Sequence, residues 1–169
     1  MVDPSARWVA RRTLLVVGEG LQFLQHVKTL YVSRGCGLTM TIKNARGKGA
    51  RHVVDWTARQ AANRAYDAVA VLLDTDTDWS SAVVEIARKK RIGILKSEPC
   101  LEALLLRVLG HTPVGDADSL KRQLRTLIGD PVDSRSYAAR FTIEVLEASR
   151  GREPTIDGLL ALLPAATRR

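Results

Sequence analysis

Two short, uninterrupted apolar runs constrain the fold of this chain more than any other feature. Residues 13–17 read Thr-Leu-Leu-Val-Val, and residues 68–73 read Ala-Val-Ala-Val-Leu-Leu. Short runs that are apolar at nearly every position are typical of strands covered on both faces, as in a parallel sheet between helices. Weaker strand signals occur at residues 38–43, which alternate, and at residues 92–95, a short run with a glycine.

The segments between these runs have helical periodicity. Apolar residues recur every three positions over residues 20–33, and residues 51–66 and 80–90 have comparable patterns. Alternating strands and helices predict an α/β fold, a Rossmann-like parallel sheet of about four strands flanked by helices. Right-handed crossovers would bring the carboxyl ends of the strands to one edge of the sheet, where such folds bind ligands.

The second half of the chain has a different character. Residues 99–109, 116–128, 134–149 and 155–163 have helical patterns separated by Gly and Pro, and we find no further strand signal. We therefore predict an α/β core over residues 1–110 and a helical extension packed on that core over residues 111–169.

The charge balance favours a polyanionic partner. The chain has 26 Lys and Arg against 18 Asp and Glu, a net charge of +8, which makes nucleic acid the first candidate. No apolar run approaches the roughly 20 residues that cross a bilayer, so we expect no membrane association. Cys36 and Cys100 lack metal-ligand or disulfide-framework spacing, which favours a cytoplasmic protein.

Three aspartates follow the second apolar run directly. In an extended chain, residues two apart point to the same side, so Asp74 and Asp76 converge. Convergent carboxylates repel each other, and a hard cation such as Mg²⁺ or Mn²⁺ relieves the repulsion. The alternative is a solvated turn in which Asp78 caps the next helix, but this leaves Asp74 and Asp76 unexplained. A calcium loop of the EF-hand type is excluded because Trp79 replaces the turn glycine.

A single glutamate follows the first apolar run, in Val17-Gly-Glu-Gly20. If the two strands are neighbours, Glu19 lies at the same edge of the sheet as Asp74. A dinucleotide loop is a poor interpretation, because the third glycine is absent and a carboxylate would repel a pyrophosphate. The alternative is that Glu19 is an acidic residue placed favourably near a helix N-terminus.

A strand ending in Gly-Glu-Gly and a later strand ending in Asp-x-Asp together resemble the Toprim domain of topoisomerases, primases and related nucleases. A third segment, Lys96-Ser-Glu-Pro-Cys-Leu-Glu102 followed by Ala-Leu-Leu-Leu, resembles the Ser-Asn-Pro-Cys-Phe-Glu motif of the RloB-like branch. That branch occurs in bacterial restriction and phage-defence loci. The three motifs span residues 14–106, and Glu98 stands where the branch usually has Asn.

This resemblance implies a Mg²⁺-dependent nuclease or nucleic-acid-processing protein that cleaves phosphodiester bonds. Glu19, Asp74 and Asp76 would be the catalytic residues, with Glu19 as general acid or base or as a metal ligand. The implied metal ligands are these three together with Asp78 and Glu102. For Glu102, an exposed position on a helix is an equally open interpretation.

A basic segment joins the second strand to the second helix. Residues 43–52 interleave basic side chains with glycines, which allow a backbone to approach phosphates closely. We predict that nucleic acid contacts Lys43, Arg46, Lys48, Arg51 and, from a later strand, Lys96. The alternative is an ordinary solvated loop.

Two other functions remain open from the sequence. One is a phosphoacceptor signalling domain, in which Glu19, Asp74 and Lys96 would take the acidic, acceptor and lysine roles. The other is a catalytically silent module that binds nucleic acid through its basic surface. The sequence leaves open the choice among DNA, RNA and nucleotide substrates, and the need for a partner subunit or a homo-oligomer.

Overall fold

A computed structural model describes residues 11–166 and confirms the predicted α/β class. Four parallel strands form one sheet in the order β2-β1-β3-β4. The strands are β1 (Arg12–Gly18), β2 (Leu38–Lys43), β3 (Ala68–Asp74) and β4 (Gly93–Ser97). The helices are α1 (Leu21–Tyr31), α2 (Gly49–Ala62), α3 (Ser81–Lys89), α4 (Leu101–Val108), α5 (Ala117–Ile128), α6 (Ile143–Ser149) and α7 (Pro154–Ala161), with a 3-10 turn η1 (Ser134–Tyr137).

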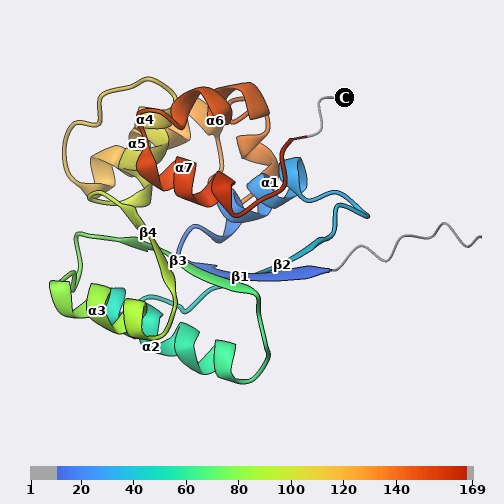
Figure 1. The fold of residues 1–169 in the computed structure, drawn as a ribbon. Coiled ribbons are helices and arrows are strands. Elements are labelled where there is room, and N and C mark those ends of the chain that lie inside the picture. The colour runs from blue at the N-terminus through green and yellow to red at the C-terminus, as the bar shows by residue number, and fades with distance from the viewer. Residues whose placement is uncertain (1–10, 167–169) are drawn as a thin grey trace, which may run out of the picture.

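Helices cover both faces of the sheet, which explains why β1 and β3 are apolar at nearly every position. In Figure 1, α2 and α3 lie below the sheet, and α1 with α4 to α7 lies above it. Alternate residues of β1 supply the two layers: Leu14 and Val16 pack with the upper helices, and Leu15 and Val17 pack with α2 and α3. The carboxyl ends of all four strands therefore emerge between two helical layers.

The strand order creates a switch point between β1 and β3. After β1 the chain crosses to β2 on one side of it, and later returns to form β3 on its other side. In open parallel sheets, ligands bind in the crevice outside the carboxyl ends of the strands at such a point. The residues that follow β1 and β3 are therefore the first place to look for a site.

One predicted helix is wrong. The periodicity over residues 134–149 predicted one helix, but the structure has η1 and α6 separated by a break. Phe141 is fully buried in this break, and its carbonyl oxygen lies 2.7 Å from Nε2 of His26 on α1. The hydroxyl of Thr142 accepts a hydrogen bond from the Val145 amide and starts α6. Tertiary packing and this cap together override the helical periodicity.

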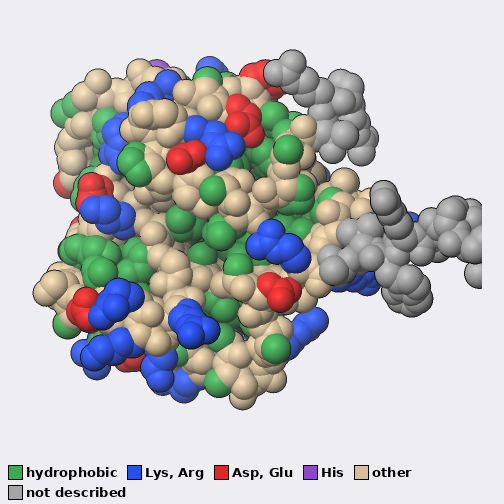
Figure 2. All heavy atoms as spheres, viewed as in Figure 1, with side chains coloured by type: hydrophobic (Ala, Val, Ile, Leu, Met, Phe, Trp, Pro, Cys, Tyr) green, Lys and Arg blue, Asp and Glu red, His purple; other side chains and the backbone are tan. Residues whose placement is uncertain are grey.

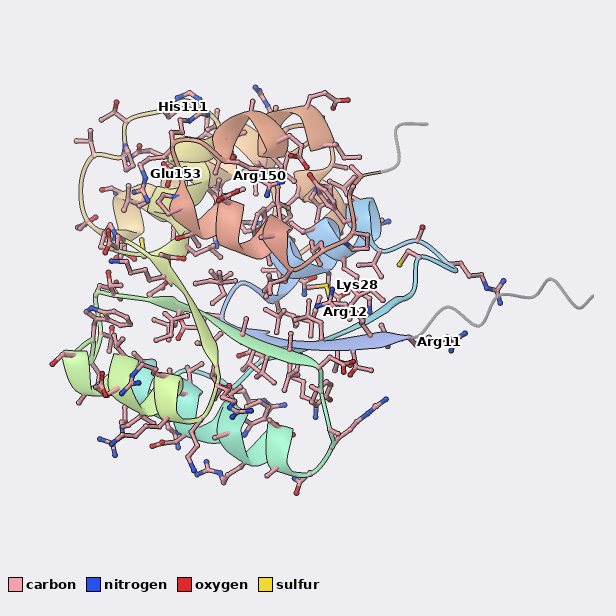
Figure 3. The ribbon with its side chains drawn as sticks, in the orientation of Figure 1. Arg11, Arg12, Lys28, His111, Arg150 and Glu153 are labelled. Atoms are coloured by element: carbon pink, nitrogen blue, oxygen red, sulfur yellow. The ribbon has the colours of Figure 1, made fainter. Side chains whose placement is uncertain are left out.

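The helical second half shares the core of the first half. Leu124, Phe141 and Leu146 belong to the same buried cluster as Leu14 and Phe23. Polar contacts join the halves as well: the Glu153 side chain, only 9% exposed, accepts a hydrogen bond from Nε of Arg107 at 3.0 Å. Figure 3 shows Glu153 in this upper helical layer, together with Arg150.

Among residues 11–166, no helix combines the length and the apolar character that crossing a membrane requires.

Candidate active site

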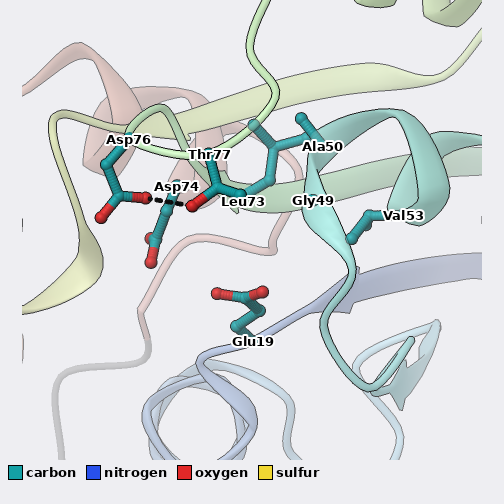
Figure 4. A pocket seen from close by; sticks show the side chains of 8 residues that line it. All are labelled: Glu19, Gly49, Ala50, Val53, Leu73, Asp74, Asp76 and Thr77. Atoms are coloured by element: carbon teal, nitrogen blue, oxygen red, sulfur yellow. Dashed lines mark hydrogen bonds between the residues drawn. The ribbon is translucent and has the colours of Figure 1, made fainter.

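A small open pocket lies at the switch point between β1 and β3. The empty space between its walls, which continues into open solvent, is about 220 Å³. Figure 4 shows its lining, which comes from the ends of β1 and β3, the β3–α3 loop and the first turns of α2. The lining residues are Glu19, Gly49, Ala50, Val53, Leu73, Asp74, Asp76 and Thr77. Three of these eight residues are acidic and none is basic.

Glu19 reaches the pocket because β1 and β3 approach each other closely where β1 ends. Gly18 pairs with Leu72, and a Cβ atom on Gly18 would lie 2.6 Å from the Leu72 carbonyl oxygen. Glycine is therefore required by this approach of two backbones. The exposed Glu19 side chain follows, and in Figure 4 its carboxylate points toward the space below Asp74.

Asp74 is the half-buried acid of the pocket, and its environment opposes ionisation. Burial is the largest cause, followed by the negative charges of Glu19, Glu102 and Asp76, and together they raise its pKa to about 8. No basic side chain lines the pocket, within the described residues, to offset these charges. Thus three carboxylates from three separate segments act on Asp74, as the sequence predicted for Glu19 and Asp76.

Asp76 and Thr77 form the outer rim of the pocket. Both side chains are exposed, and the Thr77 hydroxyl donates a hydrogen bond of 3.2 Å to Oδ1 of Asp76. The backbone of this rim is tied to the motif after β4, because the amides of Thr75 and Asp76 both donate to the Pro99 carbonyl at 3.1 Å. The β3–α3 loop therefore has a defined position relative to Asp74.

The donor set fits a hard divalent cation held by few protein ligands. In the described part of the chain, no group of three or more His, Cys, Asp or Glu side chains is arranged as a metal cage. Mg²⁺ seldom uses such a cage and is usually bound by one or two carboxylates, with waters and phosphate oxygens completing its coordination. Glu19 and Asp74 face the same space from different strands and supply these two carboxylates.

Asp78 has a different position from the other acids. It adopts a left-handed backbone conformation with φ of 54°, and its side chain lies against Gly49 at the first residue of α2. A carboxylate is favourable at a helix N-terminus because of the unpaired amides and the helix dipole. Asp78 does not line the pocket; it packs against the start of a pocket-lining helix.

This packing makes Gly49 a sensitive position. Gly49 has φ of +86°, and a Cβ atom there would lie 2.8 Å from Cβ of Asp78. We expect Gly49→Ala to lower the free energy of unfolding by about 2–4 kcal/mol, through a left-handed alanine and a steric clash. Gly47→Ala is the matched control, because Gly47 has φ of +73° but open space around it. Urea denaturation of both variants measures the difference, and equal losses would contradict a close contact with Asp78.

Glu102 lies in the first turn of α4. Its charge contributes to the raised pKa of Asp74, and it also adds to the dominant effect of burial in raising the pKa of Cys100 to about 11. Glu102 is half-buried and does not line the pocket. The structure thus places Glu102 near enough to Asp74 for its charge to act there, outside the pocket lining.

The predicted basic contacts separate into two groups. Three of them have partners within the fold: Nζ of Lys43 donates to Gln60 at 2.8 Å, Arg51 pairs with Asp55 at 3.3 Å, and Lys96 pairs with Glu98 at 2.6 Å. The other two, Arg46 and Lys48, are exposed, and neither forms an ion pair with any described residue. Lys48 directly precedes Gly49, so it lies at the pocket rim.

Basic side chains also gather away from the pocket. On the face drawn in Figure 2, Lys and Arg are densest over the part of the molecule occupied by α2 and α3 in Figure 1. The end of α3 and the residues after it contribute an exposed run, Arg88 to Arg91. Helix α2 of this layer begins at the pocket. These basic side chains therefore give a positive potential to the helical layer that borders the pocket.

Several pocket residues were not predicted from the sequence. The periodicity predicted a helix beginning at residue 51, whereas α2 begins at Gly49, so Gly49 and Ala50 line the pocket unexpectedly. Glycine is a poor helix residue, and the Lys48 cap makes no side-chain hydrogen bond that would mark the start. Thr77 was also missed, although its place between two aspartates is a signal that could have identified it.

No protein-family model, no curated protein and no solved structure matches the chain.

Proposed function

We propose that this protein is a metal-dependent phosphodiesterase that cleaves nucleic acid at the pocket between β1 and β3. The observation that carries the proposal is the uncompensated negative charge around Asp74, whose pKa is raised to about 8 by burial and by Glu19, Glu102 and Asp76. A group of carboxylates without a basic partner is costly to the fold, and a divalent cation relieves that cost. Its resemblance to Toprim and RloB-like proteins supports the same chemistry.

In this proposal Glu19 and Asp74 hold Mg²⁺ or Mn²⁺, and Asp76 lies at the rim where a substrate phosphate would approach. When bound, the cation supplies charge stabilisation to the phosphodiester during in-line displacement. Glu19 is the exposed carboxylate of the pair, so it is the residue placed to accept or return a proton at its carboxylate oxygens. Asp78 and Glu102 do not line the pocket, so neither is assigned as a ligand in this proposal.

The charge of the molecule supports nucleic acid as the substrate class. The pocket lining is acidic, yet the chain as a whole carries a charge of +8. Arg46 and Lys48, with no ion-pair partners among residues 11–166, stand beside the pocket on the segment that leads into α2. This pairing of a cation-binding pocket with a basic rim suits a phosphate backbone better than a neutral or cationic substrate. A cytoplasmic setting is part of the proposal and agrees with the free thiols of Cys36 and Cys100.

The phosphoacceptor alternative is less well supported. It needs a free lysine close to Asp74, whereas the Lys96 ammonium pairs with Glu98 at 2.6 Å. It also leaves Asp76 without a role.

A cleavage assay tests the proposal. Labelled single- and double-stranded DNA and RNA are incubated with the wild type, with Asp76→Asn, and with Asp118→Asn, an exposed acid on α5 that serves as the control. We expect cleavage only with Mg²⁺ or Mn²⁺, lowered about tenfold to a hundredfold in Asp76→Asn and unchanged in Asp118→Asn.

Equal cleavage by the wild type and Asp76→Asn, or cleavage that persists in chelator, would exclude the proposed chemistry. Binding that is independent of divalent ions, with no cleavage of any substrate, would instead support a silent nucleic-acid-binding module. Affinity should fall steeply with salt if Arg46 and Lys48 contact phosphates.

A further inference from the structure

Ser97, the last residue of β4, has the one buried side-chain oxygen or nitrogen without a hydrogen-bond partner among the described residues. Its residue exposure is 0%. A buried hydroxyl left without a partner costs about 1–3 kcal/mol, so such groups in native proteins usually have a reason. The other fully buried hydroxyls show the contrast: Thr57 donates to the Val53 carbonyl at 2.7 Å and Ser149 to the Leu146 carbonyl at 2.8 Å.

The sheet register places Ser97 beside Asp74. The two residues are direct partners in the β3–β4 ladder. Two positions earlier, Leu72 and Leu95 both pack in the cluster formed with the upper helices. Because side chains two apart share a face of the sheet, Asp74 and Ser97 leave their strands on this same face.

The start of α4 follows Ser97 closely in the chain. Cys100, three residues after Ser97, is the buried N-cap residue of α4, and both Glu102 and Asp74 act electrostatically on its thiol. The backbones after Asp74 and at Ser97 are also joined directly, because the Thr75 amide donates a hydrogen bond to the Ser97 carbonyl at 3.1 Å. Ser97 is thus buried directly beside Asp74 in the sheet, just before the start of α4.

We propose that Ser97 is a positioning residue for Asp74, whose hydroxyl donates a hydrogen bond to the Asp74 carboxylate when that carboxylate holds a divalent cation. This inference rests on the proposed cation site and names the residue that holds Asp74 in position there. A carboxylate that holds a cation is ionised and accepts hydrogen bonds strongly, and the buried Ser97 hydroxyl is a donor that lacks a partner. Groups that hold a metal ligand from behind in this way typically contribute about 10–100-fold to metal affinity.

The test separates this role from a purely structural one by measuring two properties that should change in opposite directions. Thermal unfolding and Mn²⁺ titration calorimetry are measured for the wild type, Ser97→Ala and Ser149→Ala. Without metal, we expect Ser97→Ala to melt at or above the wild-type temperature, because an unpartnered buried hydroxyl is removed. Ser149→Ala should melt lower, because a hydrogen bond is lost.

For Mn²⁺ binding, Ser97→Ala should be the impaired variant and Ser149→Ala the unaffected one. We expect the dissociation constant for Mn²⁺ to rise about tenfold or more in Ser97→Ala and to stay at the wild-type value in Ser149→Ala. Ser97→Cys, which keeps the size and a weak donor, should fall between the wild type and Ser97→Ala, and it replaces Ser97→Ala if that variant does not fold.

Equal Mn²⁺ affinity in the wild type and both Ser97 variants would overturn the role of Ser97 and leave the proposed function standing. Absence of Mn²⁺ binding to the wild type itself would overturn both.

Discussion

Asp74→Asn should abolish nucleic-acid cleavage while leaving the fold intact. The substitution keeps the size of the side chain but removes the charge that faces Glu19 across the pocket. A divalent cation contributes several kcal/mol to stabilising a phosphodiester transition state. Since each 1.4 kcal/mol is about a tenfold change in rate, we expect a loss of roughly a hundredfold or more.

The comparison variant for this experiment is Asp67→Asn. Asp67 is an exposed acid just before β3, and its carboxylate accepts hydrogen bonds from Thr13 at the other end of the sheet. Loss of this contact should affect stability but not cleavage, because Asp67 is remote from the pocket lining. Comparable cleavage rates for Asp74→Asn and the wild type, measured on the same labelled substrate, would remove Asp74 from the chemistry.

The second large effect is on the pH dependence of stability without metal. The pKa of Asp74 in the folded protein, about 8, lies above its ordinary value of 3.8, so the folded state holds this proton more tightly than the unfolded chain. The resulting stabilisation is fully present below about pH 4 and is lost as the pH rises toward 8. The free energy of unfolding of the wild type should therefore decline across this pH range as Asp74 ionises. Asp74→Asn has no carboxyl group at this position and should not show this decline.

We expect Asp74→Asn to gain on the order of 2–4 kcal/mol relative to the wild type between pH 5 and pH 8. Urea denaturation in chelator at several pH values measures this gain. Asp67→Asn is again the control: hydrogen bonds from Thr13 lower the pKa of Asp67, so this group is ionised in both states above pH 5. Its difference from the wild type should stay constant. If the stability difference between Asp74→Asn and the wild type also stayed constant with pH, the carboxylates around Asp74 would not be raising its pKa.

The pairing of Glu19 with Asp74 was predictable from the sequence because it depends on few facts. Both residues follow runs that are apolar at nearly every position, which is typical of strands inside a parallel sheet. The prediction required these two strands to be neighbours, and the structure shows that they are. Once the strands are parallel and adjacent, their carboxyl ends meet at one edge. Local composition was enough to identify these strands, whereas their order in the sheet comes from the structure.

Other features depend on contacts between distant segments and had no local signal. Asp78 turns toward Gly49 only because its own backbone is left-handed, with φ of 54°. The break at Phe141 depends on a pocket among α1 and η1 aromatic residues, where the Phe23 and Phe141 rings lie 5.6 Å apart. The missing partner of Ser97 Oγ is likewise a property of packing. Sequence patterns describe a residue's own segment, so none of these could be read from one segment alone.

The central claim is that Glu19 and Asp74 jointly bind a divalent cation, and crystals grown with Mn²⁺ test it most directly. We predict an anomalous density peak within coordination distance of carboxylate oxygens of both residues, at about 2.0–2.3 Å as expected for a hard cation of this size. An ordered pocket in which the two carboxylates face apart, with Mn²⁺ elsewhere or not bound, would contradict the account.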